Sequence, residues 1–126
     1  MNNMAAPSPG LARRRFPRRQ FPRLISILYR GEYHKGYGVE IGEGGMLIEV
    51  GVNITEGEII LVNFMMPATG ISIVQSEVRS TRVGEHSSQY GLLFLNLDYD
   101  GRKGIREYIS SKSMQESVEE MKRFKY

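Results

Sequence analysis

The feature that most constrains the fold is a series of short apolar segments, rich in β-branched residues and separated by turn-forming residues. Six such segments occur, at residues 24–29, 36–41, 46–50, 58–66, 71–83 and 89–97. In the longest, Ile71, Ile73 and Val78 are the apolar positions that we expect to face a core. Short strands at this close spacing predict an antiparallel sheet closed or folded on itself. We therefore expect an all-β domain, either a small barrel or a sandwich.

The hydrophobic period changes after the last of these segments. Asp100 is a plausible N-cap, and Ile105, Tyr108 and Ile109 would share one face of a helix. A second helical spacing, or a continuation of the first, follows at Met114, Val118 and Met121. The pattern therefore predicts a helix after the sheet and a helical extension over residues 111–126.

The length of 126 residues suggests one domain. We place its core at residues 13–110, and the Pro-, Ser-, Gly- and Ala-containing residues 1–12 form a predicted disordered tail. The chain has no Cys, which fits a reducing compartment. No apolar run reaches the ~18 residues of a membrane span, and residues 1–12 lack a signal-peptide core. We expect a cytoplasmic protein.

Positive charge is concentrated in one segment. Residues 13–23, RRRFPRRQFPR, hold six of the 17 basic residues and no acid, so acidic residues outnumber basic ones in the rest of the chain. Charge confined in this way indicates a local anion site or a basic tail, rather than a surface that is basic throughout. A solvated tail that binds nothing in particular remains the alternative.

The residue types needed for catalysis or metal binding do not cluster. His34 and His86 fall in predicted turns without neighbouring ligands, and surface positions explain them. Asp98 and Asp100 stand at a strand-to-helix junction, where capping accounts for them. The chain contains no P-loop, no G-x-S-x-G and no H-E-x-x-H. We predict neither a metal site nor catalytic residues, and we do not expect an enzyme.

Arginines and glycines together supply what an anion site needs. Arginine offers a planar fork of donors for phosphate and can stack on a purine. Arg14 and Arg18 would stand up to ~13–14 Å apart in an extended segment, which suits a bulky planar anion. The turn at residues 42–45, GEGG, permits positive φ and close approach of backbone. If arm and turn meet, Glu40 would accept hydrogen bonds from a base edge; a plain hairpin turn is the alternative.

At these residues the sequence resembles the PilZ domain family, whose motifs are R-x-x-x-R before the first strand and D/N-x-S-x-x-G at a hairpin turn. Residues 14–18, RRFPR, match the first motif, and residues 40–45, EIGEGG, match the second only in part. Gly45 agrees with the second motif, whereas Glu40 and Gly42 replace the usual Asp or Asn and Ser. The ending at residues 90–109 is also similar. The resemblance implies a six-stranded antiparallel β-barrel flanked by one α-helix, and binding of the bacterial messenger cyclic di-GMP.

The resemblance implies a set of ligand-binding residues: Arg13, Arg14, Arg18, Glu40, Gly42 and Gly45. Arg13 doubles the first arginine, which in the family accompanies a stacked pair of messenger molecules. Arg19 begins a second R-x-x-x-R that ends at Arg23, and with Arg79 it is a possible additional contact. The two departures in the second motif remove or displace hydrogen bonds, so we expect binding weakened by about fivefold to a hundredfold.

The function implied is that of a single-domain bacterial receptor or adaptor. Its arm, mobile as far as Arg23 when free, folds onto the barrel with the messenger and presents a new surface to an unidentified effector protein. We expect no cofactor besides this ligand, and a monomer or weak dimer. One alternative is a PilZ-type protein-interaction module, for instance in type IV pilus function, that binds the messenger weakly or not at all. Another is a nucleic-acid-binding barrel, which is disfavoured because Phe64 and Phe94 are predicted to be buried and the barrel is acidic.

Overall fold

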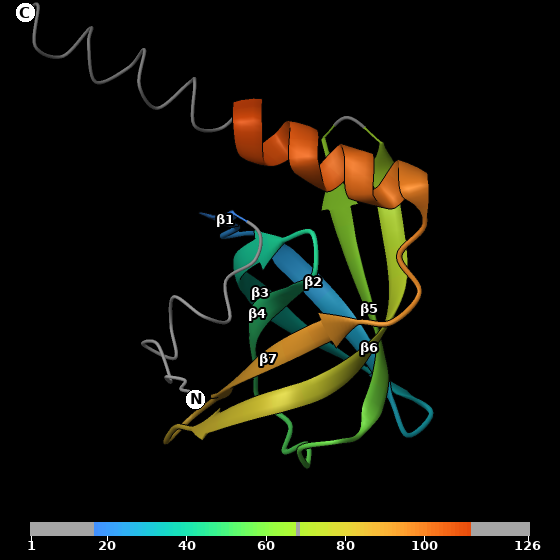
Figure 1. Ribbon diagram of the computed structural model, residues 1–126. Coiled ribbons are helices and arrows are strands. Elements are labelled where there is room, and N and C mark those ends of the chain that lie inside the picture. The colour runs from blue at the N-terminus through green and yellow to red at the C-terminus, as the bar shows by residue number, and fades with distance from the viewer. Residues whose placement is uncertain (1–16, 68, 112–126) are drawn as a thin grey trace, which may run out of the picture.

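The computed structural model describes residues 17–67 and 69–111, and these form seven strands and a helix (Figure 1). The helix occupies residues 99–111 and follows the last strand. The strands, in chain order, are β1 (Arg18–Gln20), β2 (Leu24–Tyr29), β3 (Glu32–Gly42), β4 (Gly45–Val50), β5 (Ile59–Met66), β6 (Gly70–Val83) and β7 (Ser88–Phe94).

The sheet is antiparallel and closed. Its order is β1-β3-β2-β5-β6-β7-β4, and β4 also pairs with β3, which joins the two ends. Strands β2 to β7 therefore make a six-stranded barrel, and β1 is an extra strand beside the end of β3. The predicted fold class, a six-stranded antiparallel barrel flanked by one helix, is confirmed. The strand β1 was not predicted.

Strand β3 starts earlier than its sequence indicates. Residues 30–36 were expected to form a turn, but the turn consists only of Arg30 and Gly31, with φ values of 52° and 80°. Positive φ at both central residues is the geometry of a tight two-residue hairpin. Because the hairpin is this short, pairing resumes at Glu32, so His34 lies in a strand and not in a turn.

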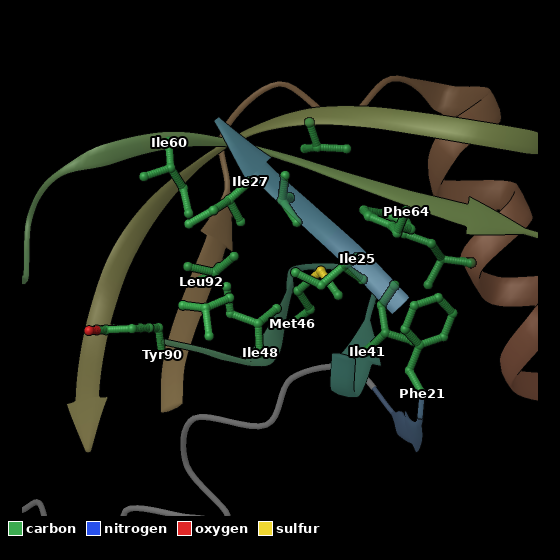
Figure 2. Packing of buried hydrophobic residues seen from close by; sticks show 14 of the residues in the cluster. Phe21, Ile25, Ile27, Ile41, Met46, Ile48, Ile60, Phe64, Tyr90 and Leu92 are labelled. Atoms are coloured by element: carbon green, nitrogen blue, oxygen red, sulfur yellow. The ribbon is translucent and has the colours of Figure 1, made fainter. Parts of the chain in front are cut away.

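Inward-facing side chains from every barrel strand form one core, part of which Figure 2 shows. In β6 the predicted positions are partly wrong. Val78 is buried together with Val74 and Ser76, whereas Ile71 and Ile73 are 69% and 64% exposed. Alternation along a strand allows only one set to face inward, and the three residues at 74, 76 and 78 are that set.

The helix covers the end of the barrel at which β5 finishes (Figure 1). The predicted face of Ile105, Tyr108 and Ile109 is buried there. Its cap differs from the prediction, because the Gly101 N–H donates to Oδ1 of Asp98 at 2.7 Å, and the Asp98 carbonyl accepts from Arg102. Asp98, rather than Asp100, therefore caps the helix.

The predicted tail at residues 1–12 lies outside the described residues, and so does the predicted extension at 111–126 apart from residue 111, which ends the helix. Over the part of the chain that is described, no helix has the length and apolar character to cross a membrane.

Candidate functional site

Strand β1 places Arg18 beside the residues of the second motif. Arg18 lies opposite Gly42 on β3, and Gln20 lies opposite Glu40. Nη1 of Arg18 stands 3.7 Å from Oε1 of Glu40, and the two side chains are 43% and 30% exposed. This separation is longer than a good hydrogen bond, so the contact is a loose ion pair at the surface.

Gly42 and Gly45 serve close approach, and the expectation of positive φ at this turn is wrong for both. A Cβ on Gly42 would stand 3.0 Å from the Pro17 carbonyl oxygen and 3.2 Å from Cγ of Arg18. A Cβ on Gly45 would overlap the carbonyl oxygen of Leu92. Glycine at these positions therefore lets β1 lie against β3, and lets β4 lie against β7.

A second ion pair, which was not predicted, joins the turn to the helix. Arg106 donates from Nε to Oε2 of Glu43 at 3.1 Å and from Nη2 to Oε1 at 2.9 Å. Glu43 is only 8% exposed. The hydrogen bonds from Arg106 hold the pKa of this carboxyl below its ordinary value. The partners stand 63 residues apart, so no local pattern pairs them.

The helix also holds the arginine arm. Tyr108 donates its hydroxyl to the Gln20 carbonyl at 3.0 Å, and its ring meets Phe21 edge-on at 5.5 Å. Phe21 is fully buried and also contacts Phe64 edge-on (Figure 2). The guanidinium of Arg23 lies 5.8 Å from the ring centroids of both Phe21 and Tyr108. Residues 17–23 are thus packed on the barrel and the helix through Phe21, an aromatic anchor that the sequence analysis did not include; mobility of the arm as far as Arg23 in the free protein stays a prediction.

The other predicted contacts are spread more widely. Arg19 lies opposite Ile41 and is half-buried. Arg79 is exposed at a bulge of β6, and β4 and β7 separate it from β3. Three strand spacings amount to about 14 Å. Arg13 and Arg14 lie outside the described residues. The structure thus brings together Arg18 with the second motif at residues 40–45, but leaves Arg79 apart.

Metal ligands do not gather anywhere in residues 17–67 and 69–111. His34 stands 4.0 Å from Glu32 in a surface contact. Two exposed aromatic residues on β3 were not singled out from the sequence. They are Tyr33 and Tyr37, which are 71% and 60% exposed. They lie opposite Leu28 and Leu24 on β2, in the part of β3 that precedes the glycine turn at residues 42–45.

Fold and site together define a class: a small antiparallel barrel with a cationic strand on its outer surface and a helix that braces both that strand and the adjoining glycine turn. The family model for the PilZ domain matches residues 12–111. The chain therefore belongs to the PilZ family.

Solved structures agree with this fold. The PilZ domain of YcgR from Escherichia coli, solved with c-di-GMP, has a TM-score of 0.69 and 16% identity, over 85% of this chain and 98% of that chain. The longer YcgR in complex with c-di-GMP has a TM-score of 0.68 and 20% identity, with 89% and 50% covered.

MotI/DgrA, an inhibitor of motility from Bacillus subtilis, gives a TM-score of 0.71 at 14% identity, with 82% and 52% covered. The present chain thus spans about half the length of these longer proteins. No curated protein matches the sequence.

Proposed function

We propose that this protein is a receptor for cyclic di-GMP, and that the messenger binds on the outer surface of β1, β3 and β4. The observation that carries the proposal is the position of Arg18, which adjoins Gly42 and Glu40. Within the described part of the chain its ion pair is the 3.7 Å contact with Glu40. A phosphate offers a guanidinium two short charge-assisted bonds, which are stronger than this contact. The messenger therefore displaces Glu40 from Arg18.

Each predicted residue takes a role in this proposal. Arg13 and Arg14 bring further cations to the phosphates or stack on a guanine, and Arg19 and Arg79 extend the set. Gly42 and Gly45 act through packing: they let β1 lie against β3 and β4 lie against β7, which holds Arg18 and the turn in place beside the ligand. Glu40, once released, accepts hydrogen bonds from a guanine edge.

The helix is the element through which binding reaches another surface. Tyr108 holds β1, and Arg106 holds the turn that follows Gly42. A ligand that draws Arg18 outward acts on both of these contacts. An effector protein then binds the surface formed by the barrel face, the ligand and the helix, and the chain acts as an adaptor.

Titration calorimetry with cyclic di-GMP tests the proposal. We expect binding by the unaltered chain, and at least roughly tenfold weaker binding by Arg18→Ala, since a lost charged hydrogen bond costs about 1.5–3 kcal/mol. Arg82→Ala is the matched control, because Arg82 is exposed on β6 and has no ion pair among the described residues. Equal affinities for the three proteins would remove Arg18 from the site.

A second candidate is a PilZ-type protein-interaction module that does not bind the messenger appreciably. The contact between Arg18 and Glu40 favours it, because the messenger must compete with a carboxylate already in place. In that case the unaltered chain gives no heat of binding, and the double variant Glu40→Asp with Gly42→Ser gains it. A heat of binding measured when cyclic di-GMP is titrated into the unaltered chain excludes this candidate.

A further inference from the structure

The first half of β6 is an edge strand. β6 pairs with β5 from Gly70 to Glu77, but its pairing with β7 begins only at Ser76, opposite Phe94. Residues 70–75 therefore have a strand on one side only among the described residues. In Figure 1 the segment after β7 rises past this yellow-green half of β6 on its way to the helix.

The backbone of this edge offers hydrogen-bonding groups. The Gln75 carbonyl accepts from Leu95 at 2.8 Å, and the Gln75 N–H donates to Oδ1 of Asn96 at 2.9 Å. The backbone N–H and C=O of Gln75 thus point away from β5. Backbone groups of successive residues in a strand point to opposite sides, so those of Ile73 and Ile71 also point away from β5. Over residues 17–67 and 69–111, neither has a hydrogen-bond partner on that side.

The surroundings of this edge are apolar on one side and acidic on the other. A groove of about 240 Å³ lies between residues 71–74 and the segment from Asn96 to Gly101. Ile71 and Ile73 are 69% and 64% exposed, and Met65, opposite Ile71, is 50% exposed. Proteins usually protect such an edge with charges, proline or a covering element. Here exposed β-branched side chains stand on the edge itself.

The acidic side chains beside this edge indicate which kind of segment can bind to it. Asp98 and Asp100 line the groove, are exposed, and have no ion pair within the described part of the chain. A second copy that paired β6 with β6 about a two-fold axis would bring its own Asp98 and Asp100 to the same place, where like charges repel. A basic segment is attracted instead.

We propose that the edge of β6 at Ile71–Ile73 is a docking site for an extended, basic peptide segment of a partner protein, which adds as a further strand. Its backbone bonds to the outward groups of Ile71 and Ile73, as in other cases of strand addition. Its apolar side chains pack on the two isoleucines, and a Lys or Arg meets Asp98 and Asp100. The proposal is independent of messenger binding.

Amide hydrogen exchange of the full chain, followed by NMR, tests the edge. In the free protein we expect fast exchange at Ile71 and Ile73, and slow exchange at Ser72 and Val74, whose N–H groups face β5. Slow exchange at Ile71 and Ile73 in dilute free protein would overturn the proposal, because another part of the chain would then occupy the edge. Protection that grows with protein concentration would also overturn it, in favour of a second copy.

The probe is the blocked peptide Lys-Val-Thr-Val-Thr-Val-Lys. We expect it to slow exchange at Ile71 and Ile73 by at least about tenfold, in line with protection by strand hydrogen bonds. A version with proline for the central valine should not do so, since proline cannot donate. Asp100→Lys should weaken the peptide at least about fivefold, as charge reversal does at a complementary site.

Glu85→Lys is the matched control, because Glu85 is exposed in the turn between β6 and β7, and this variant should bind like the unaltered chain. Equal binding of the proline peptide, or chemical-shift changes confined to other strands, would contradict the proposal.

Discussion

Two ion pairs flank Gly42, and they differ in the distance between the charged groups and in the burial of the acid. On the outer surface, Arg18 and Glu40 stand 3.7 Å apart, with both side chains partly exposed. On the side of the helix, Arg106 makes two hydrogen bonds to Glu43, which is almost completely buried. An exposed ion pair contributes about 0–1 kcal/mol, whereas a buried carboxylate that loses its charged hydrogen-bond donor costs about 1.5–3 kcal/mol. The Arg106 side chain is itself 57% exposed, so only the acid of this pair is buried.

This difference distinguishes an ion pair that stabilises the fold from one whose arginine can bind a ligand. The pair at Glu43 fixes the turn against the helix, and Arg106 cannot leave without depriving a buried carboxylate of its partner. The pair at Arg18 costs little to break, so a ligand with phosphates can take the guanidinium. Residues close together in the second motif thus have different roles, and four experiments test this contrast.

The largest effect is expected from Arg106→Gln. It leaves the buried Glu43 carboxylate without its charged hydrogen-bond donor, and should lower the free energy of unfolding by about 2 kcal/mol, because the exposed Arg106 side chain is partly screened by water. Urea denaturation measures this change. Lys103→Gln, on the exposed face of the same helix, is the control and should stay within about 0.5 kcal/mol. A loss below about 1 kcal/mol for Arg106→Gln would show that both pairs are equally weak.

Arg18→Ala should show the opposite pattern. We expect the free energy of unfolding to change by less than about 1 kcal/mol, because the pair is loose and exposed. Messenger affinity should fall by about tenfold to a hundredfold, since the guanidinium meets phosphate. Denaturation and calorimetry on one preparation measure both quantities. A large loss of stability together with unchanged affinity would reverse the assignment.

The third effect concerns pH. The pKa of Glu43 is lowered by Arg106, so the carboxylate's contribution is fully present above the ordinary carboxyl pKa and is lost as pH falls through the folded pKa. We expect the stability advantage over Glu43→Gln to shrink as pH falls below about 4, near the ordinary Glu value.

Denaturation at a series of pH values measures this difference. The pKa values of Glu49 and Glu58 are also lowered, by hydrogen bonds from Gln89 and Tyr29 respectively, but both proteins share these contributions. An advantage that stays constant down to pH 3 would contradict the assignment to Glu43.

The smallest effect is expected from Glu40→Asp combined with Gly42→Ser. The shorter acid releases Arg18 and the serine restores a hydroxyl, so messenger affinity should rise by about threefold to tenfold. The gain is limited because the new Cβ stands 3.0 Å from the Pro17 oxygen and β1 must shift slightly. Glu40→Asp alone separates the two contributions. Weaker binding by the double variant would mean that β1 is displaced.

Much of the fold could be read from local pattern. The six barrel strands and the buried helix face at residues 105–109 follow from apolar periodicity, and the two motifs identified the family. Strand β1 could not be predicted, because RRQ has little strand preference of its own and pairs only since the end of β3 offers it an edge. Ile71 and Ile73 were misplaced because an apolar residue in a strand can lie on either face.

The barrel, the helix and the positions of the arginine and glycine motifs could be inferred from the amino-acid sequence alone, because they depend on residue type and short-range spacing. Tertiary structure decided that Arg18 adjoins Gly42, that Glu43 rather than Glu40 is the buried acid, and that half of β6 lacks a second neighbour. Each of these results depends on residues brought together from distant parts of the chain: 63 positions separate Glu43 from Arg106, and 88 separate Gln20 from Tyr108. Local periodicity cannot specify such contacts, since they exist only after the sheet has closed and the helix has packed on its end.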